Sequence, residues 1–414
     1  MAVMRQRLNP ALIRRLNVAR VFHALRLAGA ASQSELARLT GLDQATVSAV
    51  VRHLRDDGWL TTTEAARAGR SGRPPTLLTI DSAAGVLIGA RLEPGIVRVL
   101  TTTLVGEART AWQGSAGRSV EDALATLAAG VDASLRDIDV SWSAVKAIGV
   151  GVPALMSRDG RLAYGPNLRW RDVALQARLA ERWSVPVAVD NDSSAAALAE
   201  KLFGAARDAR DFVVIAGHSG VGGALYLGGR LYRGAGGFAG EIGHVCVEPG
   251  GRLCGCGDRG CLEAYLTEGA LADQLGERGR QLHSYEAIAA AADGGDDVVR
   301  EILEQAGARL GHVIADLVDV LDPELIVLAG ALSHVVPWLL PAIERVRASE
   351  SLGSYRGRCQ VTTSTLGAEA VTMGGVGLAM EAVLSLPSWL VDQDGVLGDR
   401  EGAGEAAPAR VEPT

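Results

Sequence analysis

A short glycine-rich stretch of this chain holds the side chains best suited to bind a metal. Four of the five cysteines fall between positions 246 and 261, and a histidine stands two residues before the first of them. Thiolates and an imidazole suit Zn²⁺, a borderline-soft ion that prefers four ligands in a tetrahedron. The stretch therefore predicts a structural zinc site, because an ion held by four side chains has no open position for water.

The spacing alone leaves the fourth ligand open. Three thiolates come from the later cysteines, which are Cys254, Cys256 and Cys261. If residues 243–247 form a strand, His244 and Cys246 point to the same face, so either could complete the set. Free thiols are the alternative interpretation, although buried thiolates need a cation beside them.

Positive charge is concentrated in the first 80 residues. This segment holds 12 Lys and Arg residues against 5 Asp and Glu residues, whereas the rest of the chain holds 29 against 43. A basic segment joined to an acidic body indicates a nucleic-acid-binding module attached to a domain that binds no nucleic acid.

Three helices in the order of a helix-turn-helix are expected within residues 12–60. Ser32 and Glu35 have the spacing of a capping box, and Asp43 can cap a third helix that runs to about Asp57. On that helix the apolar residues expected to face the core are Val47, Val50, Val51 and Leu54. The outer surface would place small or hydrogen-bonding side chains against base edges in a major groove, with Arg52 reaching phosphate or guanine. These candidate DNA contacts are Gln44, Ala45, Thr46, Ser48 and Arg52.

Two further arginines lie in a glycine- and proline-rich loop. Arg70 and Arg73 fall between the expected strands Trp59–Thr63 and one that begins at Leu77. Such a loop is typical of a wing whose arginines enter a narrow, electronegative minor groove. A flexible linker between domains is the alternative for the loop, and an ordinary three-helix bundle is the alternative for the helices.

The rest of the chain reads as an α/β domain. Gly85–Leu104 and Phe212–Leu231 each indicate strands around a turn, and each opens one half of the body, which predicts two similar lobes. Further buried strands are expected at Val145–Val152 and Val185–Asp190. The second leads into an Ala-rich helix from Ser193 to Leu202.

Length and hydropathy place these parts in one globular protein. The 414 residues suffice for two or three domains with a sizeable core. No stretch is apolar enough to cross a membrane, and the first residues lack the apolar core of a signal peptide. We therefore expect a cytoplasmic protein without a membrane partner, in which clustered cysteines favour a metal over disulfides.

Six short stretches resemble the ROK family, which groups sugar-responsive repressors with bacterial sugar kinases. They are Gly149–Pro153, Pro166–Leu168 with Trp170, Val189–Ser193, Ser219–Gly223, Gly240–His244 and Cys254–Glu263. The resemblance covers nearly the whole chain. It implies a winged helix-turn-helix for residues 1–80, followed by a two-lobed actin-like ATPase (RNase H-like) domain of class α/β for residues 84–390. Residues 391–414, rich in Gly, Ala, Glu and Pro, would form a disordered tail.

The resemblance also implies a sugar site in the cleft between the lobes. Its contacts, carried over by position, would be Asn167, Asn191, Asp192, Glu241, His244 and Glu263. Polyols need paired acceptors and donors on short loops, which carboxylates and amides supply. The same resemblance selects His244 as the fourth zinc ligand, with its other ring nitrogen turned toward a sugar hydroxyl. A simple helix cap is the alternative for Asn191 and Asp192, which stand between a strand and a helix.

The residues that a kinase needs to bind ATP and Mg²⁺ are only partly present in this chain. In kinases of this family Asp192 would be the general base, but such enzymes also need Gly-rich turns for ATP and an acidic residue for Mg²⁺. Where family kinases have Asp-x-Gly after the first strand, this chain has Arg91 and Glu93. Arg91 cannot bind Mg²⁺, and Glu93 brings negative charge toward phosphate. We therefore expect no enzyme activity, with a sugar kinase carrying a DNA-binding arm as the alternative.

Together these features predict a sugar-responsive regulator, with repression favoured and activation left open. It would be a homodimer or homotetramer, because paired helix-turn-helix units read two half-sites of operator DNA. A body that has lost sugar sensing and serves as a dimerisation platform is a further alternative. The sequence names neither the sugar nor the operator.

Overall fold

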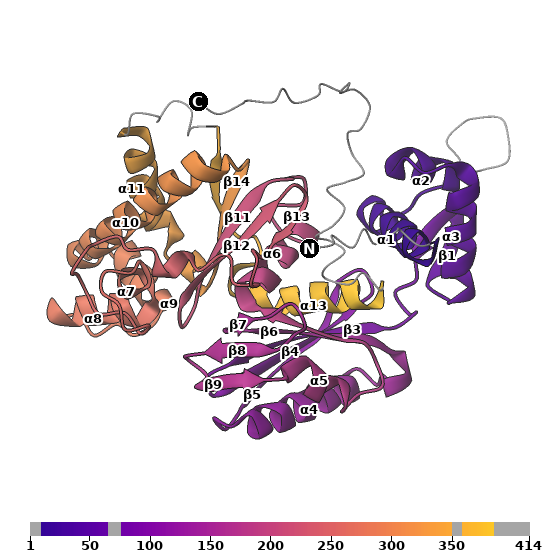
Figure 1. Ribbon diagram of the computed structural model, residues 1–414, viewed down its shortest axis with the longest axis horizontal. Helices are drawn as coiled ribbons and strands as arrows, with labels where there is room; N and C mark the ends of the chain where they lie inside the picture. Colours follow the sequence, from indigo (N-terminus) through magenta and orange to yellow (C-terminus); the bar gives the residue numbers. More distant parts are fainter. Residues whose placement is uncertain (1–9, 65–75, 350–357, 385–414) are drawn as a thin grey trace, which may run out of the picture.

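The computed structural model describes residues 10–64, 76–349 and 358–384. They form a small N-terminal domain and a body of two lobes, as Figure 1 shows. Within these ranges, no helix has the length and apolar character needed to cross a membrane.

The N-terminal domain is a winged helix. It comprises helices α1 (Pro10–Ala28), α2 (Gln33–Thr40) and α3 (Gln44–Asp56), followed by the antiparallel strands β1 (Leu60–Glu64) and β2 (Thr76–Ile80). The capping box at Ser32 and Glu35 is present, and the Asp43 side chain accepts a hydrogen bond from the backbone N–H of Thr46 at 2.9 Å. These caps fix where α2 and α3 begin, because they satisfy backbone donors that a helix leaves unpaired.

The core of this domain follows the expected helical spacing. The α3 residues predicted to face inward are all buried: Val47, Val50, Val51 and Leu54. Between α2 and α3 the chain turns at Gly41, which has a φ of 68°. This left-handed conformation suits glycine, because it has no side chain to clash with the backbone.

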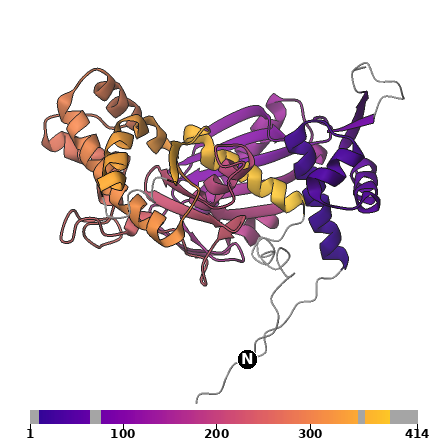
Figure 2. The ribbon, with the colours of Figure 1, turned by 90° about the horizontal axis from the view of Figure 1, so that it is seen from above.

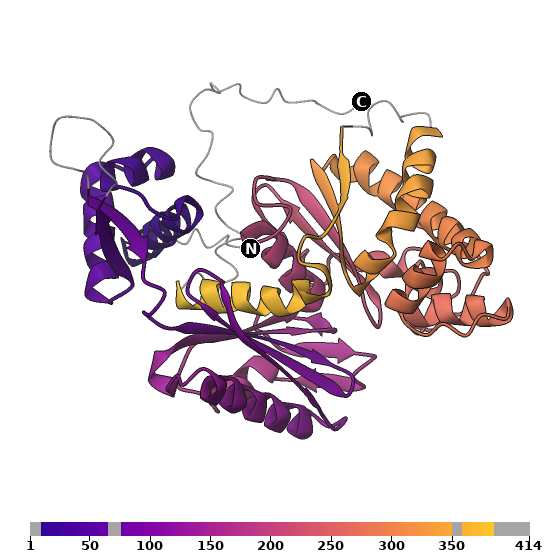
Figure 3. The same cartoon turned by 180° about the vertical axis from the view of Figure 1, so that it is seen from behind.

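The first lobe is built on a five-stranded sheet in the order β10-β6-β3-β4-β5. Its strands are β3 (Val86–Glu93), β4 (Ile96–Thr103), β5 (Ala108–Ser115), β6 (Val145–Val152) and β10 (Val187–Asn191). Helices α4 (Val120–Asp137) and α5 (Leu175–Ala180) lie on one face, and the C-terminal helix α13 (Ala370–Val383) lies on the other, as Figure 3 shows from behind. A small antiparallel sheet projects from this lobe, with strands β7 (Leu155–Met156), β8 (Leu162–Gly165) and β9 (Trp170–Val173).

The second lobe has a sheet in the order β13-β12-β11-β14-β15. Its strands are β11 (Phe212–Gly217), β12 (Val221–Leu227), β13 (Arg230–Tyr232), β14 (Leu325–Gly330) and β15 (Gln360–Thr363). The helices of this lobe are α7 (Glu263–Leu266), α8 (Glu268–Glu277), α9 (Tyr285–Asp293), α10 (Asp297–Leu321) and α11 (Val336–Ser349). Apolar residues of α8 to α11 and of the sheet form one buried core.

The two sheets share one topology. In each, three consecutive strands form an antiparallel meander, and the first of them pairs in parallel with a fourth strand that pairs in parallel with a fifth. The lobes are therefore similar units, as the repeated strand–turn–strand pattern predicts, and the expected actin-like architecture is confirmed.

Two helices join the lobes. Helix α6 (Asp192–Leu202) contacts β6 and β10 of the first sheet and β11 and β12 of the second. Helix α13 returns from the end of the second lobe and packs against β3, β6 and α6. This packing is close, because a Cβ atom added to Gly149 in β6 would lie 2.0 Å from the carbonyl oxygen of Gly375 in α13. Glycine is required where two backbones approach to this extent.

The winged helix domain packs directly on the body. One hydrophobic cluster runs from α1 and α3 through Leu202 and Phe203 at the end of α6 to Met380 and Leu384 at the end of α13. Figure 2 shows from above how α13 points toward this domain. The Nη1 atom of Arg26, in the last turn of α1, donates a hydrogen bond of 2.9 Å to the carbonyl oxygen of Leu202. The winged helix domain is thus in contact with the C-terminal end of α6.

Candidate functional site

A pocket of about 360 Å³ lies between the lobes and collects the polar residues carried over from the family resemblance. One wall comes from the first lobe and the N-terminal end of α6, and the other comes from β11, β12 and the loops that follow β13. All six candidate sugar contacts line it: Asn167, Asn191, Asp192, Glu241, His244 and Glu263.

Asn191 is the N-cap of α6. Its Oδ1 atom accepts hydrogen bonds from the backbone N–H groups of Ser193 at 2.8 Å and Ser194 at 3.2 Å. Its Nδ2 atom donates to the carbonyl oxygen of Ala154 at 3.0 Å. The helix-cap interpretation of Asn191 is therefore correct for its side-chain oxygen. Its amide nitrogen carries a second hydrogen that it can donate, and Asn191 lines the pocket.

Asp192 begins α6 and reaches the pocket from the helix N-terminus, where the backbone dipoles favour a negative charge. Burial raises the pKa of this carboxyl group, and the positive charge of Arg91 partly opposes the increase. An acidic group in this position can accept hydrogen bonds from a bound polyol.

The opposite wall includes Glu241, His244 and Glu263, which flank the loop that carries the cysteines. The Nε2 atom of His244 lies 3.8 Å from Oε2 of Glu241. Burial raises the pKa of Glu241; the negative charges of Asp192 and Glu263 add to the increase, whereas His244 opposes it. The Oε2 atom of Glu263 accepts a hydrogen bond of 3.0 Å from the backbone N–H of Val221, which ties the start of α7 to the β11–β12 turn.

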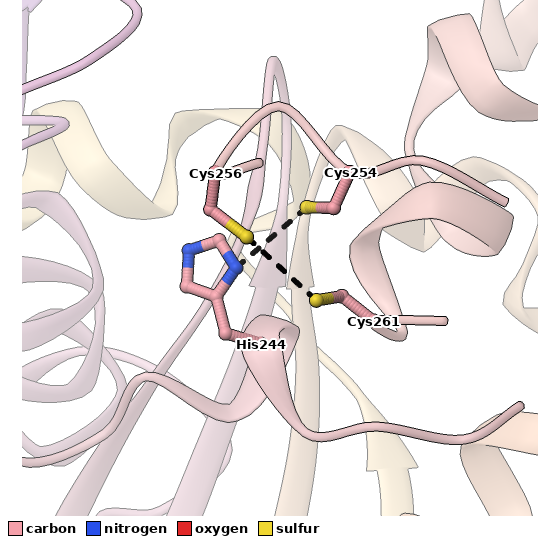
Figure 4. Close-up of side chains that lie close together, drawn as sticks. All are labelled: His244, Cys254, Cys256 and Cys261. Atoms are coloured by element: carbon pink, nitrogen blue, oxygen red, sulfur yellow. Dashed lines mark hydrogen bonds between the residues drawn. The ribbon is translucent and has the colours of Figure 1, made fainter. Parts of the chain in front are cut away.

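The metal candidates lie together as a set of four donors, shown in Figure 4. One ligand atom from each of His244, Cys254, Cys256 and Cys261 lies within 4.8 Å of every other. Sγ of Cys254 is 3.8 Å from Nδ1 of His244, and Sγ of Cys256 is 3.8 Å from Sγ of Cys261. A tetrahedron with centre-to-sulfur distances of about 2.3 Å has edges of about 3.8 Å, so these residues fit a tetrahedral metal.

Protonation also favours a cation here. Burial raises the pKa of the Cys254 and Cys261 thiols, so thiolates at these positions need a positive charge beside them. His244 turns Nδ1 toward the cysteines and Nε2 toward Glu241, which places one imidazole between the metal candidates and the pocket. A metal at this site would therefore orient a residue that lines the pocket.

Cys246 lies outside the set of four. Residues 242–244 form a short 3₁₀ helix, so the strand considered for residues 243–247 is not present. Cys246 instead pairs with Cys261 in an isolated β-bridge, and its thiol donates to the carbonyl oxygen of Arg259 at 3.7 Å. The change of direction after His244 separates the two side chains that a strand would have placed on one face.

Arg91 and Glu93 are paired with each other rather than directed into the pocket. Nη2 of Arg91, which is 3% exposed, lies 2.6 Å from Oε1 of Glu93. Nε of Arg98 lies 3.3 Å from the other carboxylate oxygen of Glu93. The charge of Glu93 is therefore matched by two guanidinium groups, which the sequence interpretation of an unbalanced negative charge did not anticipate.

Sequence reasoning missed several residues that line the pocket. His218, at the end of β11, accepts a hydrogen bond at Nδ1 from the backbone N–H of Ala331 at 3.3 Å, and burial lowers the pKa of its imidazole well below the usual value. Its position immediately before a Gly-rich turn was the available signal. The aromatic rings of Tyr164 and Phe238 also line the pocket, although neither belongs to a motif used in the sequence analysis.

The expected DNA-contacting face of α3 is presented to solvent. Gln44, Ala45 and Arg52 are exposed, whereas Thr46 and Ser48 are half-buried. Oγ of Ser48 donates to Oε1 of Gln33 in α2 at 2.7 Å, so its hydroxyl helps to fix α2 against α3. Arg70 and Arg73 lie outside the described residues.

Two family models match this chain. The model described as "ROK family" matches residues 98–382, and the model described as "MarR family" matches residues 15–71. These matches agree with the body and with the winged helix domain, respectively.

Among known proteins, the xylose repressor of Bacillus subtilis is 27% identical over 359 residues, covering 86% of this chain and 92% of that protein. The DNA-binding transcriptional dual regulator NagC of Escherichia coli is 29% identical over 392 residues, covering 91% of this chain and 95% of that protein.

Solved structures include both regulators and kinases. A ROK family transcriptional regulator described as a homologue of the E. coli MLC protein has a TM-score of 0.78 and 28% identity, covering 93% of this chain and all of that one. A ROK family glucokinase from Streptomyces griseus, solved with glucose and AMPPNP, has a TM-score of 0.65 and 26% identity, covering 72% of this chain and all of that one. The alignment with the regulator is long enough to include the winged helix domain. The alignment with the glucokinase is only about as long as the two-lobed body.

Proposed function

This chain belongs to the ROK family, and from that membership we propose that it is a sugar-responsive transcriptional repressor that works in the cytoplasm. Its winged helix domain binds operator DNA, and its body binds a sugar that weakens this binding. The observation that carries the proposal is one chain that joins a MarR-type winged helix to a polar pocket between two lobes. Relatives named xylose repressor and N-acetylglucosamine repressor support it.

The sugar binds in the pocket between the lobes. Asp192, Glu241 and Glu263 accept hydrogen bonds from its hydroxyl groups, and the amide groups of Asn167 and Asn191 add donors. None of the described residues that line this pocket is Lys or Arg, so the site favours an uncharged sugar over an anionic one.

Zn²⁺ is the metal that best suits the four-donor set. Three thiolates and one imidazole match its preference for soft and borderline ligands, and the full set of protein ligands makes the site structural. When bound, the ion fixes the loop that carries Cys254, Cys256 and Cys261 and neutralises their thiolate charge. His244, held on its Nδ1 side, then presents Nε2 beside Glu241 at the pocket wall.

The body works as a sensor rather than as a kinase. Arg91 occupies the end of β3 where a kinase of this family would carry an acidic residue for Mg²⁺, and its Nη2 atom is in an ion pair with Glu93. His218, which immediately precedes the Gly-rich turn, packs against the Gly330–Ala331 turn. A kinase retains support from Asp192, which stands at the position of the family's general base.

Operator DNA is read by α3 and by the wing. Exposed Gln44, Ala45 and Arg52 enter the major groove with Thr46 and Ser48, while Arg70 and Arg73 reach the minor groove. A homodimer or homotetramer supplies the two winged helices that a two-fold operator requires. The domain bounds expected from the sequence, residues 1–80 and 84–390, remain the working division of the chain.

Helix α6 supplies a direct route from the sugar to the DNA-binding arm. Asn191 and Asp192 stand at its N-terminal end in the pocket, and Leu202 at its C-terminal end accepts the hydrogen bond from Arg26 of α1. The guanidinium of Arg26 also lies over the Phe203 ring, 5.1 Å from its centroid. Closure of the lobes on a sugar moves α6 as a rigid element and thereby shifts the contact with the winged helix.

A thermal-shift screen of the metal-loaded chain tests this function. Xylose, glucose and N-acetylglucosamine are compared, each with and without ATP and Mg²⁺, and a coupled ATP-turnover assay follows for any sugar that stabilises. The proposal expects one sugar to raise the melting temperature without help from ATP and no saturable turnover. Stabilisation that requires ATP, with turnover, would make the chain a kinase instead.

A further inference from the structure

Two aromatic rings stand at the mouth of the pocket, one from each lobe. Tyr164 comes from β8 of the small sheet and is 41% exposed, and Phe238 comes from the loop after β13 and is 42% exposed. Both line the pocket that holds the carboxylates. Large apolar side chains scattered singly on a surface need no explanation, but two at one pocket mouth indicate a binding surface.

The segments that carry these rings are held in place. Nη2 of Arg158, in the β7–β8 turn, donates a hydrogen bond of 2.9 Å to the carbonyl oxygen of Gly234, which precedes Phe238 in its loop. The loop also approaches β7 closely, because a Cβ atom added to Gly237 would lie 2.9 Å from the carbonyl oxygen of Met156. Contacts between the two lobes therefore fix the segments that carry the rings.

Tyr164 has one face already covered. The guanidinium carbon of Arg171 lies 4.6 Å from the centroid of its ring, a cation–π contact that fixes the ring plane. A ligand stacked on the other face would meet a surface whose orientation is set in advance, which reduces the entropy lost on binding.

The inner and outer parts of the pocket differ in chemistry. The half-buried carboxylates of Asp192 and Glu263 provide hydrogen-bond acceptors for the hydroxyl groups of one sugar ring, and Glu241, whose side chain is 45% exposed, adds an acceptor at a more exposed position. The outer part offers the two rings together with Leu155, which suit the apolar C–H face of a pyranose because aromatic faces carry negative charge density. The pocket volume of about 360 Å³ lies in the lower part of the range of about 300–1,000 Å³ typical of small-molecule pockets, so a second ring would extend toward the exposed rings at its mouth.

We propose that Tyr164 and Phe238 form an outer subsite for a second sugar ring, so that the preferred effector is a disaccharide or the end of a longer oligosaccharide. Its terminal ring occupies the carboxylate-lined inner part, and the next ring stacks on the two aromatic side chains. This inference rests on the proposed sugar-sensing function and specifies the ligand class of the same pocket.

Calorimetry on the metal-loaded full chain compares four monosaccharide–disaccharide pairs. They are xylose with β-1,4-xylobiose, glucose with cellobiose, glucose with maltose, and N-acetylglucosamine with N,N′-diacetylchitobiose. We expect at least one disaccharide to bind about tenfold more tightly than its monosaccharide, the gain that aromatic stacking of one further ring provides.

The variants Tyr164→Ala and Phe238→Ala test whether the two rings cause the tighter binding of the disaccharide. Each is expected to remove most of the preference for the disaccharide while leaving monosaccharide affinity within about twofold of wild type. Tyr232→Ala is the matched control, because Tyr232 is 52% exposed and does not line the pocket. Circular dichroism melts confirm that each variant is folded.

Two results would overturn the subsite while leaving sugar sensing intact. One is that every monosaccharide binds as tightly as its disaccharide. The other is that the two aromatic substitutions weaken both ligands of a pair equally, which would mean that the rings close on a single sugar. Absence of binding by all of these saccharides would overturn the sugar-sensing function itself, and the subsite with it.

Discussion

Replacement of Arg26 by methionine is expected to uncouple sugar binding from DNA binding. The substitution keeps an unbranched apolar stem in the cluster between α1 and α6 but removes the guanidinium. It thereby deletes the hydrogen bond to the carbonyl oxygen of Leu202 and the contact with the Phe203 ring. Burial and the nearby Arg207 lower the pKa of Arg26 to about 10, so the side chain is still charged at pH 7 and both contacts are charge-assisted.

The size of the effect follows from these two contacts. A hydrogen bond from a charged group contributes about 1.5–3 kcal/mol and a cation–π contact about 0.5–1 kcal/mol, so the domain contact loses roughly 2–4 kcal/mol. Only the part that differs between the sugar-free and sugar-bound states is coupling energy. If half of the lost energy, about 1–2 kcal/mol, is coupling energy, the factor by which sugar changes operator affinity falls by about five- to thirtyfold.

Fluorescence anisotropy with labelled operator DNA measures this factor as the ratio of Kd values with and without saturating sugar. Arg20→Met is the matched control, because it removes a charge from an exposed position on the same helix. Sugar affinity measured by calorimetry should stay within about threefold of wild type in both variants, since neither residue lines the pocket. If Arg26→Met responds to sugar as strongly as wild type, α6 does not transmit the signal through this contact.

Three further expectations concern the metal, a buried carboxyl group and the DNA-binding helix. Cys261→Ser should lose the bound zinc, whereas Cys246→Ser should keep one equivalent per chain by elemental analysis; metal loss from both variants would contradict the assigned ligand set. Burial raises the pKa of Glu381 to about 7, so the ionised carboxylate destabilises the folded protein. This cost is absent below about pH 4.5, where the group is neutral in both states, and it is fully present once the pH has risen through 7. Glu381→Gln should therefore raise the free energy of unfolding in urea by about 1–3 kcal/mol at pH 8 and change it little at pH 5; equal effects at both pH values would refute this cause. Arg52→Ala should weaken operator binding about tenfold in gel shifts, and the exposed Arg136→Ala in α4 should not; an unchanged affinity for the first variant would remove α3 from the interface.

Local signals were sufficient for the winged helix domain. The capping box at Ser32, the cap at Asp43 and the glycine turn at Gly41 act over a few residues, so the boundaries of α2 and α3 follow from the sequence. The buried face of α3 likewise follows from helical spacing.

The two-lobed body was predictable as a class but not in its long-range contacts. The strand–turn–strand units near residues 86 and 212 indicate repeated lobes, and both sheets have one strand order. No local pattern predicts that α13 packs on the first sheet. The glycines of α13 allow close contact with strands that lie far away in the sequence, so their role is visible only in the fold. The position of α6 between the two sheets could not be predicted for the same reason, since it depends on contacts between distant segments.

The site was predictable where a motif carries it. The resemblance to a family selected six residues that the fold brings to one pocket, including His244, which spacing alone could not choose over Cys246. It gave no signal for Tyr164 or Phe238, which lie outside the motifs and reach the pocket through contacts between the lobes. Nor could it foresee that Glu93 is matched by Arg91 and Arg98.

The control of operator binding by sugar can be measured in a single titration. The full metal-loaded chain is titrated onto an operator selected by the chain itself from random DNA, with and without the sugar that stabilises it most. We expect sugar to raise the operator Kd by about tenfold or more in wild type and to leave it unchanged in Asp192→Asn, which still binds DNA. An operator Kd that does not change with a sugar shown by calorimetry to bind the wild-type pocket would contradict it.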